Sequence, residues 1–170
     1  MAARSVTIRD ASGDDLPGIL AIYNEVIASS TAVYRETPVT LDDRRQWFNA
    51  RQEQSYPVLV AVDDSGILGF ASYGDFRAWP GYRFSVEHTV HIRSDERGRG
   101  VGTALMRALM RRATEQGKHV MLGGVDADNE PSLRFHDRLG FARAARLHQV
   151  GFKFGRWLDL VFVERVLGGT

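Results

Sequence analysis

The sequence predicts an α/β fold in which helices flank one mixed β-sheet. Strand-like apolar segments alternate with segments whose apolar residues recur at helical spacing. Their order is strand, two helices, three strands, helix, strand, helix and two strands. Short turns join two strand pairs, which predicts antiparallel neighbours, and helix-bearing crossovers predict parallel ones. Both kinds of connection in one chain indicate a mixed sheet.

The helices are predicted from their caps and from apolar spacing. Capping-box patterns at Ser12 to Asp15 and at Thr40 to Asp43 open the first two helices. The first continues with apolar residues at helical spacing, namely Leu16, Ile19, Leu20, Tyr23, Val26 and Ile27. The third helix runs from Val101 to Gln116 and ends at Gly117. The fourth runs from Pro131 to Leu139, with Pro131 in its first turn.

The strands are predicted from β-rich segments bounded by turn residues. In chain order they are Val6 to Arg9, Tyr56 to Val62, Ile67 to Tyr73, Phe84 to Ile92, His119 to Val125, His148 to Phe154 and Leu158 to Arg165. Asp63 to Gly66 is expected to be one hairpin turn, and Gly155-Arg156 the other.

Length and composition exclude several classes of protein. The 170 residues are 44% hydrophobic and 25% charged, without repeat or linker, which predicts a single domain over residues 1–170. The net charge of +1 argues against a nucleic-acid partner, and the absence of cysteine excludes disulfides and thiolate sites. With no leader-like start and no apolar run of about 18 residues, we expect a cytoplasmic protein without a membrane partner.

A glycine-rich loop between a strand and a helix is the most informative segment. Ile92 to Thr103 places glycines at alternate positions before a helix start, where free N–H groups and the helix dipole bind anions. The loop is expected to bind a ligand that carries two phosphates in series. The expected ligand-binding residues are Arg97, Gly98, Arg99, Gly100, Val101, Gly102 and Thr103. A P-loop would need a lysine here, and a Rossmann loop should follow the first strand of a βαβ unit. A plain strand-to-helix turn is the alternative.

Two blocks resemble the GNAT superfamily of N-acetyltransferases. Arg97-x-x-Gly100-x-Gly102 is similar to its acyl-CoA pyrophosphate motif, and the stretch from Asn129 to Phe141 to its Asn … Leu-Gly-Phe element. The phosphinothricin and methionine-sulfoximine N-acetyltransferases are similar over nearly the whole chain, most specifically from Gly151 to Asp159. The resemblance implies a GNAT-like fold, a mostly antiparallel sheet with a splayed strand pair. It also implies acetyl-CoA as cosubstrate and a homodimer.

Acetyl transfer to an amine needs a base, a polarised thioester and a proton for the leaving thiolate. Strand alternation places Glu87, Thr89 and His91 on one face, and Glu87 is our candidate base. A solvated or paired glutamate is the alternative. His136 stands where many superfamily members carry an acidic tyrosine, so it is expected to protonate the thiolate or relay a proton. The alternative is a histidine packed beside Phe141.

The superfamily pattern also implies contacts with the pantetheine arm of the cofactor. The backbone of Val90, His91 and Ile92 is expected to lie beside its amides, although relatives usually carry tyrosine in place of His91. Asn129 and Ser132 are expected at the same arm, and Asn129 is also a candidate helix N-cap. The five histidines show no metalloprotease spacing, so no metal is expected.

The segment from Gly74 to Arg83 is expected to recognise the substrate. Its two arginines, Arg77 and Arg83, can each donate two hydrogen bonds to a carboxylate or phosphinate. The resemblance favours Arg77 as the residue that binds the substrate anion. Solvated surface arginines are the alternative. Trp79 is expected to form an aromatic wall, to anchor the loop or to make a dimer contact. Tyr34 and Glu36 match the family pattern and are expected to close the site or contact the substrate ammonium.

These expectations combine into one predicted activity. The chain is expected to acetylate the amino group of a small amino acid analogue such as phosphinothricin, methionine sulfoximine or methionine sulfone. The alternatives are acetylation of a protein N-terminus or a polyamine, and a non-catalytic CoA-binding regulator. A regulator would be expected to have lost Glu87 or His136, and both are present.

Overall fold

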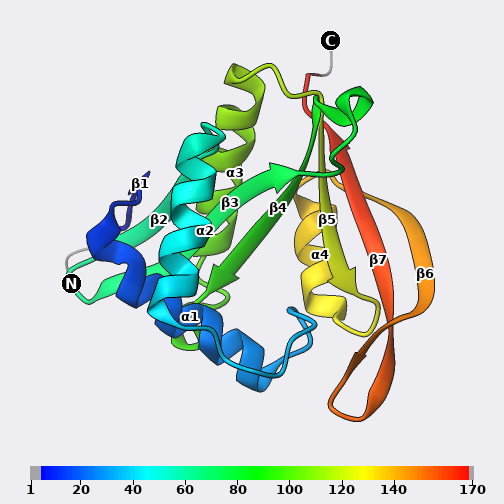
Figure 1. Ribbon diagram of the computed structural model, residues 1–170, viewed down its shortest axis with the longest axis horizontal. Helices are drawn as coiled ribbons and strands as arrows, with labels where there is room; N and C mark the ends of the chain where they lie inside the picture. The colour runs from blue at the N-terminus through cyan, green and yellow to red at the C-terminus, as the bar shows by residue number, and fades with distance from the viewer. Residues whose placement is uncertain (1–4, 169–170) are drawn as a thin grey trace. The chain divides into compact units, whose positions relative to one another are not determined.

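The computed structural model describes residues 5–168 (Figure 1). The four residues Met1–Arg4, which contribute to the expectation about a leader, lie outside the described residues. Four α-helices are present in the described chain, α1 (Leu16–Ser29), α2 (Leu41–Glu53), α3 (Val101–Glu115) and α4 (Glu130–Arg138). The strands are β1 (Thr7–Asp10), β2 (Val58–Asp63), β3 (Gly66–Asp75), β4 (Ser85–Ile92), β5 (Val120–Asp126), β6 (Ala142–Lys153) and β7 (Arg156–Val166).

The strands form one seven-stranded sheet in the order β1-β2-β3-β4-β5-β7-β6. The pairs β1/β2, β2/β3, β5/β7 and β6/β7 are antiparallel, and β4/β5 is parallel. The predicted mixed, mostly antiparallel sheet is therefore confirmed. The parallel register runs from Ser85 opposite Val120 to Glu87 opposite Leu122, so it ends at the candidate base.

The chain forms two compact units, each built from three separate segments. The first unit comprises the described chain up to Asn24, together with Val39–Gly74 and Thr89–Arg112. The second comprises Glu25–Pro38, Asp75–His88 and the chain from Ala113 onward. The single domain over residues 1–170 stays a prediction.

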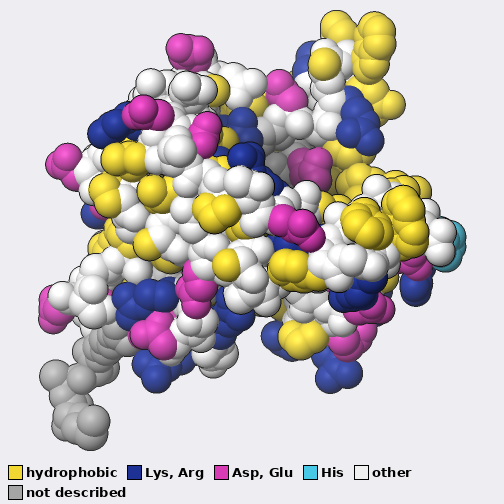
Figure 2. Space-filling model, turned by 60° about the horizontal axis from the view of Figure 1, so that its bottom comes forward, with side chains coloured by type: hydrophobic (Ala, Val, Ile, Leu, Met, Phe, Trp, Pro, Cys, Tyr) yellow, Lys and Arg dark blue, Asp and Glu magenta, His cyan; other side chains and the backbone are white. Residues whose placement is uncertain are grey.

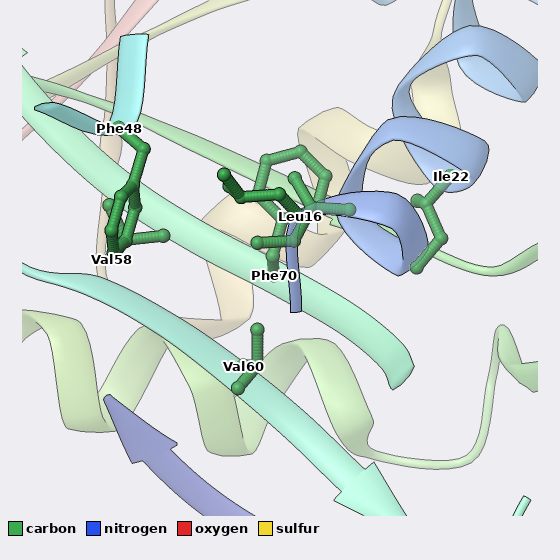
Figure 3. Close-up of a cluster of buried hydrophobic side chains, with 7 residues drawn as sticks. Leu16, Ile22, Phe48, Val58, Val60 and Phe70 are labelled. Carbon is green, nitrogen blue, oxygen red and sulfur yellow. The ribbon is translucent and has the colours of Figure 1, made fainter. Parts of the chain in front are cut away.

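The core of the first unit lies between its helices and strands (Figure 3). Apolar side chains of α1, α2, β2 and β3 meet there, namely Leu16, Ile19, Ile22, Phe48, Val58, Val60 and Phe70. Burying one such side chain contributes about 1.5–3 kcal/mol. Thr40 and Asp43 form the predicted capping box at α2, in which the Asp43 amide donates to Thr40 Oγ1 at 3.2 Å. At the first box the Ser12 amide donates to Asp15 Oδ2 at 2.8 Å, and a short 3₁₀ turn precedes α1.

The β6–β7 hairpin of the second unit differs from the prediction in two ways. Strand β6 begins at Ala142, whereas the sequence predicted a start at His148. The prediction missed the first part of the strand because the residues from 142 to 150 are all exposed and show no apolar alternation. The turn is Phe154-Gly155, one residue earlier than predicted. Its two residues have φ of 51° and 72°, as a two-residue type I′ turn requires.

Within residues 5–168, none of the helices has the length and apolar character needed to cross a membrane.

Candidate active site

The glycine-rich loop of the first unit has the geometry of an anion site. After β4 a 3₁₀ turn leads to Gly98 and Gly100, whose φ values of 75° and 84° only glycine adopts readily. The amide of Ala104 donates to the Gly100 carbonyl at 3.0 Å, which makes Gly100 the N-cap of α3. The first helical amides, from Val101 to Thr103, therefore have no intrahelical acceptor and can donate to an anion. The predicted loop geometry is confirmed, and phosphate binding there stays a prediction.

Glu96 orders this loop, and the sequence analysis missed it. Its side chain is buried, 3.3 Å from Arg93 Nη2 and 3.6 Å from Arg99 Nη1. A carboxylate between two arginines holds one of the predicted phosphate ligands in place and offsets part of the local positive charge. The signal available in the sequence was the acidic pair Asp95-Glu96 among the arginines of this loop, and the sequence did not show which of the two is buried. Arg97 and Arg99 are exposed, as residues that meet a ligand should be.

Glu87 lies on β4 within the second unit and is half-buried. Burial raises the pKa of its carboxyl group, and the positive charge of Arg77 partly opposes that rise. Oε1 lies close to Gly124 on β5, since a Cβ added at Gly124 would stand 3.5 Å from it. The neighbours Val86 and His88 are buried, as the predicted alternation requires. A carboxylate with a raised pKa has the basicity that proton removal from an amine needs.

His136 on α4 is buried and held by hydrogen bonds. Nδ1 donates to the Ser132 carbonyl at 2.7 Å, because a carbonyl oxygen can only accept. In the neutral ring Nε2 carries no proton and accepts a hydrogen bond from the Nε2–H group of His88, at 3.2 Å. The ring also packs against Phe141 at a centroid distance of 5.4 Å, and burial lowers its pKa. His136 thus packs beside Phe141, as the structural alternative predicted. Its role as an acid or proton relay stays a prediction, and His88 is now a second member of that relay.

Three further predicted cofactor residues have clear local roles. Asn129 Oδ1 accepts from the Ser132 amide at 3.2 Å, so Asn129 is the N-cap of α4. His91 packs against the rings of Tyr23 and Phe70 at 5.7 and 5.5 Å. Burial there lowers the pKa of His91 to about 4, with Arg44 and Arg97 adding to the effect. The His91 ring is therefore neutral near pH 7, and the cofactor contact expected from the His91 backbone stays a prediction.

The segment that carries Tyr34 and Glu36 lies against the β6–β7 hairpin. The Tyr34 hydroxyl donates to the Asp159 carbonyl at 3.3 Å, and burial, with nearby carboxylates, raises the Tyr34 pKa to about 12. Glu36 Oε1 accepts from the Phe154 amide at 2.6 Å. The structure thus brings these two predicted substrate residues together in the second unit.

The predicted substrate loop is exposed, and its two arginines differ in their surroundings. The Arg77 guanidinium stacks over Phe76 at 4.6 Å, and its charge acts on Glu87. The Arg83 guanidinium stacks over Phe84 at 4.4 Å and donates to the Pro80 carbonyl, within its own loop. Trp79 is 75% exposed, so in this chain its ring forms no closed wall. Of these residues, Arg77 has the electrostatic link to the candidate base.

The part of the chain that the structure describes contains no group of three or more His, Asp or Glu side chains able to hold a metal ion.

Solved structures define the class of protein to which this fold and site belong. An N-acetyltransferase from Staphylococcus aureus Mu50 is 40% identical with a TM-score of 0.94, covering 96% of this chain and 99% of that one. A phosphinothricin acetyltransferase from Sinorhizobium meliloti, solved with acetyl-CoA, is 36% identical with a TM-score of 0.92, covering 96% and 89%. The class is that of acetyl-CoA-dependent N-acetyltransferases.

The chain belongs to the acetyltransferase (GNAT) family, whose model matches residues 19–141. A relative from Pseudomonas paraeruginosa, an L-methionine sulfoximine/L-methionine sulfone acetyltransferase, is 52% identical over 167 residues. That match covers 98% of this chain and 97% of the relative. The resemblance inferred from the sequence motifs is therefore confirmed, and acetyl-CoA is the cosubstrate.

Proposed function

We propose that this enzyme acetylates the amino group of a small amino acid analogue whose side chain ends in a tetrahedral polar group. Methionine sulfoximine, methionine sulfone and phosphinothricin have such an end, and similar proteins are named for them. The observation that carries the proposal is the electrostatic link between Glu87 and Arg77, whose charge partly opposes the rise in the Glu87 pKa. A base of raised pKa within the electrostatic influence of an exposed arginine suits an amine that bears an anionic group nearby.

In the proposed mechanism, Glu87 takes the proton that the ammonium must lose, since the pKa of an α-amino group is about 8. The amine nitrogen then attacks the thioester carbon. Donors at the end of β4 stabilise the oxyanion that develops. The C–N bond forms as the C–S bond breaks. The nitrogen loses its second proton in this step, and the His136–His88 pair relays a proton to the CoA thiolate.

A thiol-release assay with acetyl-CoA and a panel of amines tests this substrate class. The panel contains the three amino acid analogues, a peptide with a free N-terminus and a polyamine. We expect turnover with the analogues at a kcat/KM at least about tenfold above that of the other two. Preference for the peptide or the polyamine would assign the site to those substrates, and no turnover with any amine would favour the regulator.

Arg77→Lys should weaken recognition of the anionic substrate group although it keeps the charge. The planar guanidinium can donate two parallel hydrogen bonds to a carboxylate or phosphinate, and a lysine ammonium cannot. Loss of a charge-assisted hydrogen bond costs about 1.5–3 kcal/mol, or roughly tenfold to a hundredfold in kcat/KM. Steady-state kinetics with the amino acid and with its amide measure this effect.

The loss should disappear with the amide, which lacks the anion. Arg45→Lys is the matched control, because Arg45 is an exposed arginine on α2 paired with Asp42. Equal losses for acid and amide would mean that Arg77 supports the loop and does not recognise the anion.

We also propose that the enzyme is a cytoplasmic homodimer. Hydrophobic side chains gather over the β6–β7 hairpin (Figure 2). Val150, Phe152, Phe154 and Trp157 are each more than half exposed there. An apolar patch of this kind supports an interface. Sedimentation should give the mass of two chains, and Phe152→Ser combined with Trp157→Ser should give the mass of one.

A further inference from the structure

Lys153, the last residue of β6, is an unusual lysine because its side chain is fully buried. Its ammonium group donates three hydrogen bonds to backbone carbonyl oxygens. The acceptors are Ile27 at 2.6 Å, Ser30 at 2.7 Å and Val33 at 2.8 Å. These bonds account for all three protons of the ammonium, so the buried charge is fully satisfied.

The three acceptors lie where α1 ends and the following segment begins. Ile27 is in the last turn of α1, where the carbonyls have no intrahelical donor and the helix dipole favours a cation. Burial lowers the pKa of Lys153, and the charge of Glu36 opposes this. A neutral side chain at this position would leave three carbonyl oxygens without their donor, which is costly inside a protein.

The neighbours of Lys153 hold the same segment at two further points. The Phe154 amide donates to Glu36 Oε1 at 2.6 Å. On the other side, a Cβ added at Gly151 would stand 2.3 Å from Tyr34 Cε2, so the Tyr34 ring lies directly on the backbone of β6. Residues 151, 153 and 154 together determine where Tyr34 and Glu36 lie.

We infer that Lys153 is a positioning residue for the amino acid site, acting through the segment from Ser30 to Glu36. It holds in place the backbone from which Tyr34 and Glu36 reach the substrate. This inference rests on the proposed function and on the substrate contact that the sequence analysis predicts for those two side chains. The Lys153 side chain is itself fully buried, and its three ammonium protons all go to backbone carbonyls. The glycine-rich loop expected to bind acetyl-CoA belongs to the other compact unit.

The first test is a comparison of the two Michaelis constants in Lys153→Met. Methionine has a similar length and removes the three hydrogen bonds. We expect the KM for the amino acid to rise about tenfold or more, and the KM for acetyl-CoA to stay within about twofold. Lys153→Arg keeps the charge and should restore part of the affinity. Arg35→Met, which removes an exposed cation from the same segment, is the control and should change neither constant.

The second test does not depend on activity. Arg35 is exposed within the held segment, so trypsin cleavage after it reports how firmly that segment is fixed. Cleavage there should be at least about tenfold faster in Lys153→Met than in the unmodified enzyme. Arg35→Met removes the site and identifies the fragment. Gly151→Ala, which displaces the Tyr34 ring without touching Lys153, should also raise the amino acid KM. If Lys153→Met does not fold, Lys153→Arg decides the matter, because its altered hydrogen bonds should raise the amino acid KM and the cleavage rate to a smaller extent.

An equal rise in both Michaelis constants, or cleavage after Arg35 at the unmodified rate, would overturn the inference. If the unmodified enzyme acetylates none of the amines, the proposed function fails, and the cleavage rates still decide whether Lys153 holds the segment.

Discussion

Glu87→Gln is expected to lower kcat by roughly 10²–10⁴-fold, the usual contribution of a general base. Glutamine keeps the shape of the side chain and loses its basicity. The affinity for acetyl-CoA should change little, because Glu87 and the glycine-rich loop belong to different compact units. Thiol-release kinetics measure the first effect and calorimetry the second. Glu115→Gln, which changes an exposed carboxylate on α3, is the matched control.

The direction of the Glu87 pKa shift adds a dependence on pH. Burial raises this pKa in the folded enzyme, so the folded state binds the proton more tightly than the unfolded state. The ionised carboxylate therefore lowers the free energy of unfolding at pH 7. This destabilisation disappears as the pH falls through the raised pKa and the carboxylate becomes protonated. Glu87→Gln should raise the melting temperature at pH 7, and the difference should shrink toward pH 4.

Removing the Arg77 charge should shift the same titration upward. Arg77→Met would raise the Glu87 pKa further and move the acidic limb of the kcat/KM profile to higher pH.

Full kcat in Glu87→Gln below pH 7, where the amine is mostly protonated, would show that another group is the base.

Gly100→Asp should weaken acetyl-CoA binding by roughly tenfold to a hundredfold, measured by calorimetry on the folded variant. Gly100 has a φ of 84°, which costs about 1–2 kcal/mol for a residue with a side chain. The new carboxylate would also stand beside the phosphates expected at the start of α3, and like charges repel. Nothing lies within 4 Å of a Cβ added at Gly100, so steric clash does not explain the loss.

Two control variants separate these causes. Gly100→Ala imposes the backbone strain without the charge and should show the smaller loss. Gly66→Asp adds the same strain and charge at the β2–β3 turn, where φ is 108°, and should bind acetyl-CoA normally. Unchanged affinity in Gly100→Asp would place the pyrophosphate elsewhere.

Predictions from the sequence were accurate where the signal lies in a few consecutive residues. The capping box from Thr40 to Asp43, the glycines of the phosphate loop and the alternation around Glu87 are all present in the structure. The first half of β6 was missed because an exposed edge strand has no buried face and so no apolar pattern. The turn at Phe154-Gly155 was misplaced by one residue, because a phenylalanine with positive φ is uncommon.

The sequence by itself determined the family, the cosubstrate and the glycine-rich loop before α3, because motif spacing and helix starts are local properties of the chain. Only the tertiary structure decided the surroundings of the reactive groups. His136 meets His88 across 48 residues of sequence, and Lys153 binds Ile27 across 126. The rise in the Glu87 pKa likewise comes from burial and is partly opposed by Arg77, which lies in the loop after β3. Desolvation and charge–charge interactions depend on distance in space, and the spacing of residues along the chain does not determine them.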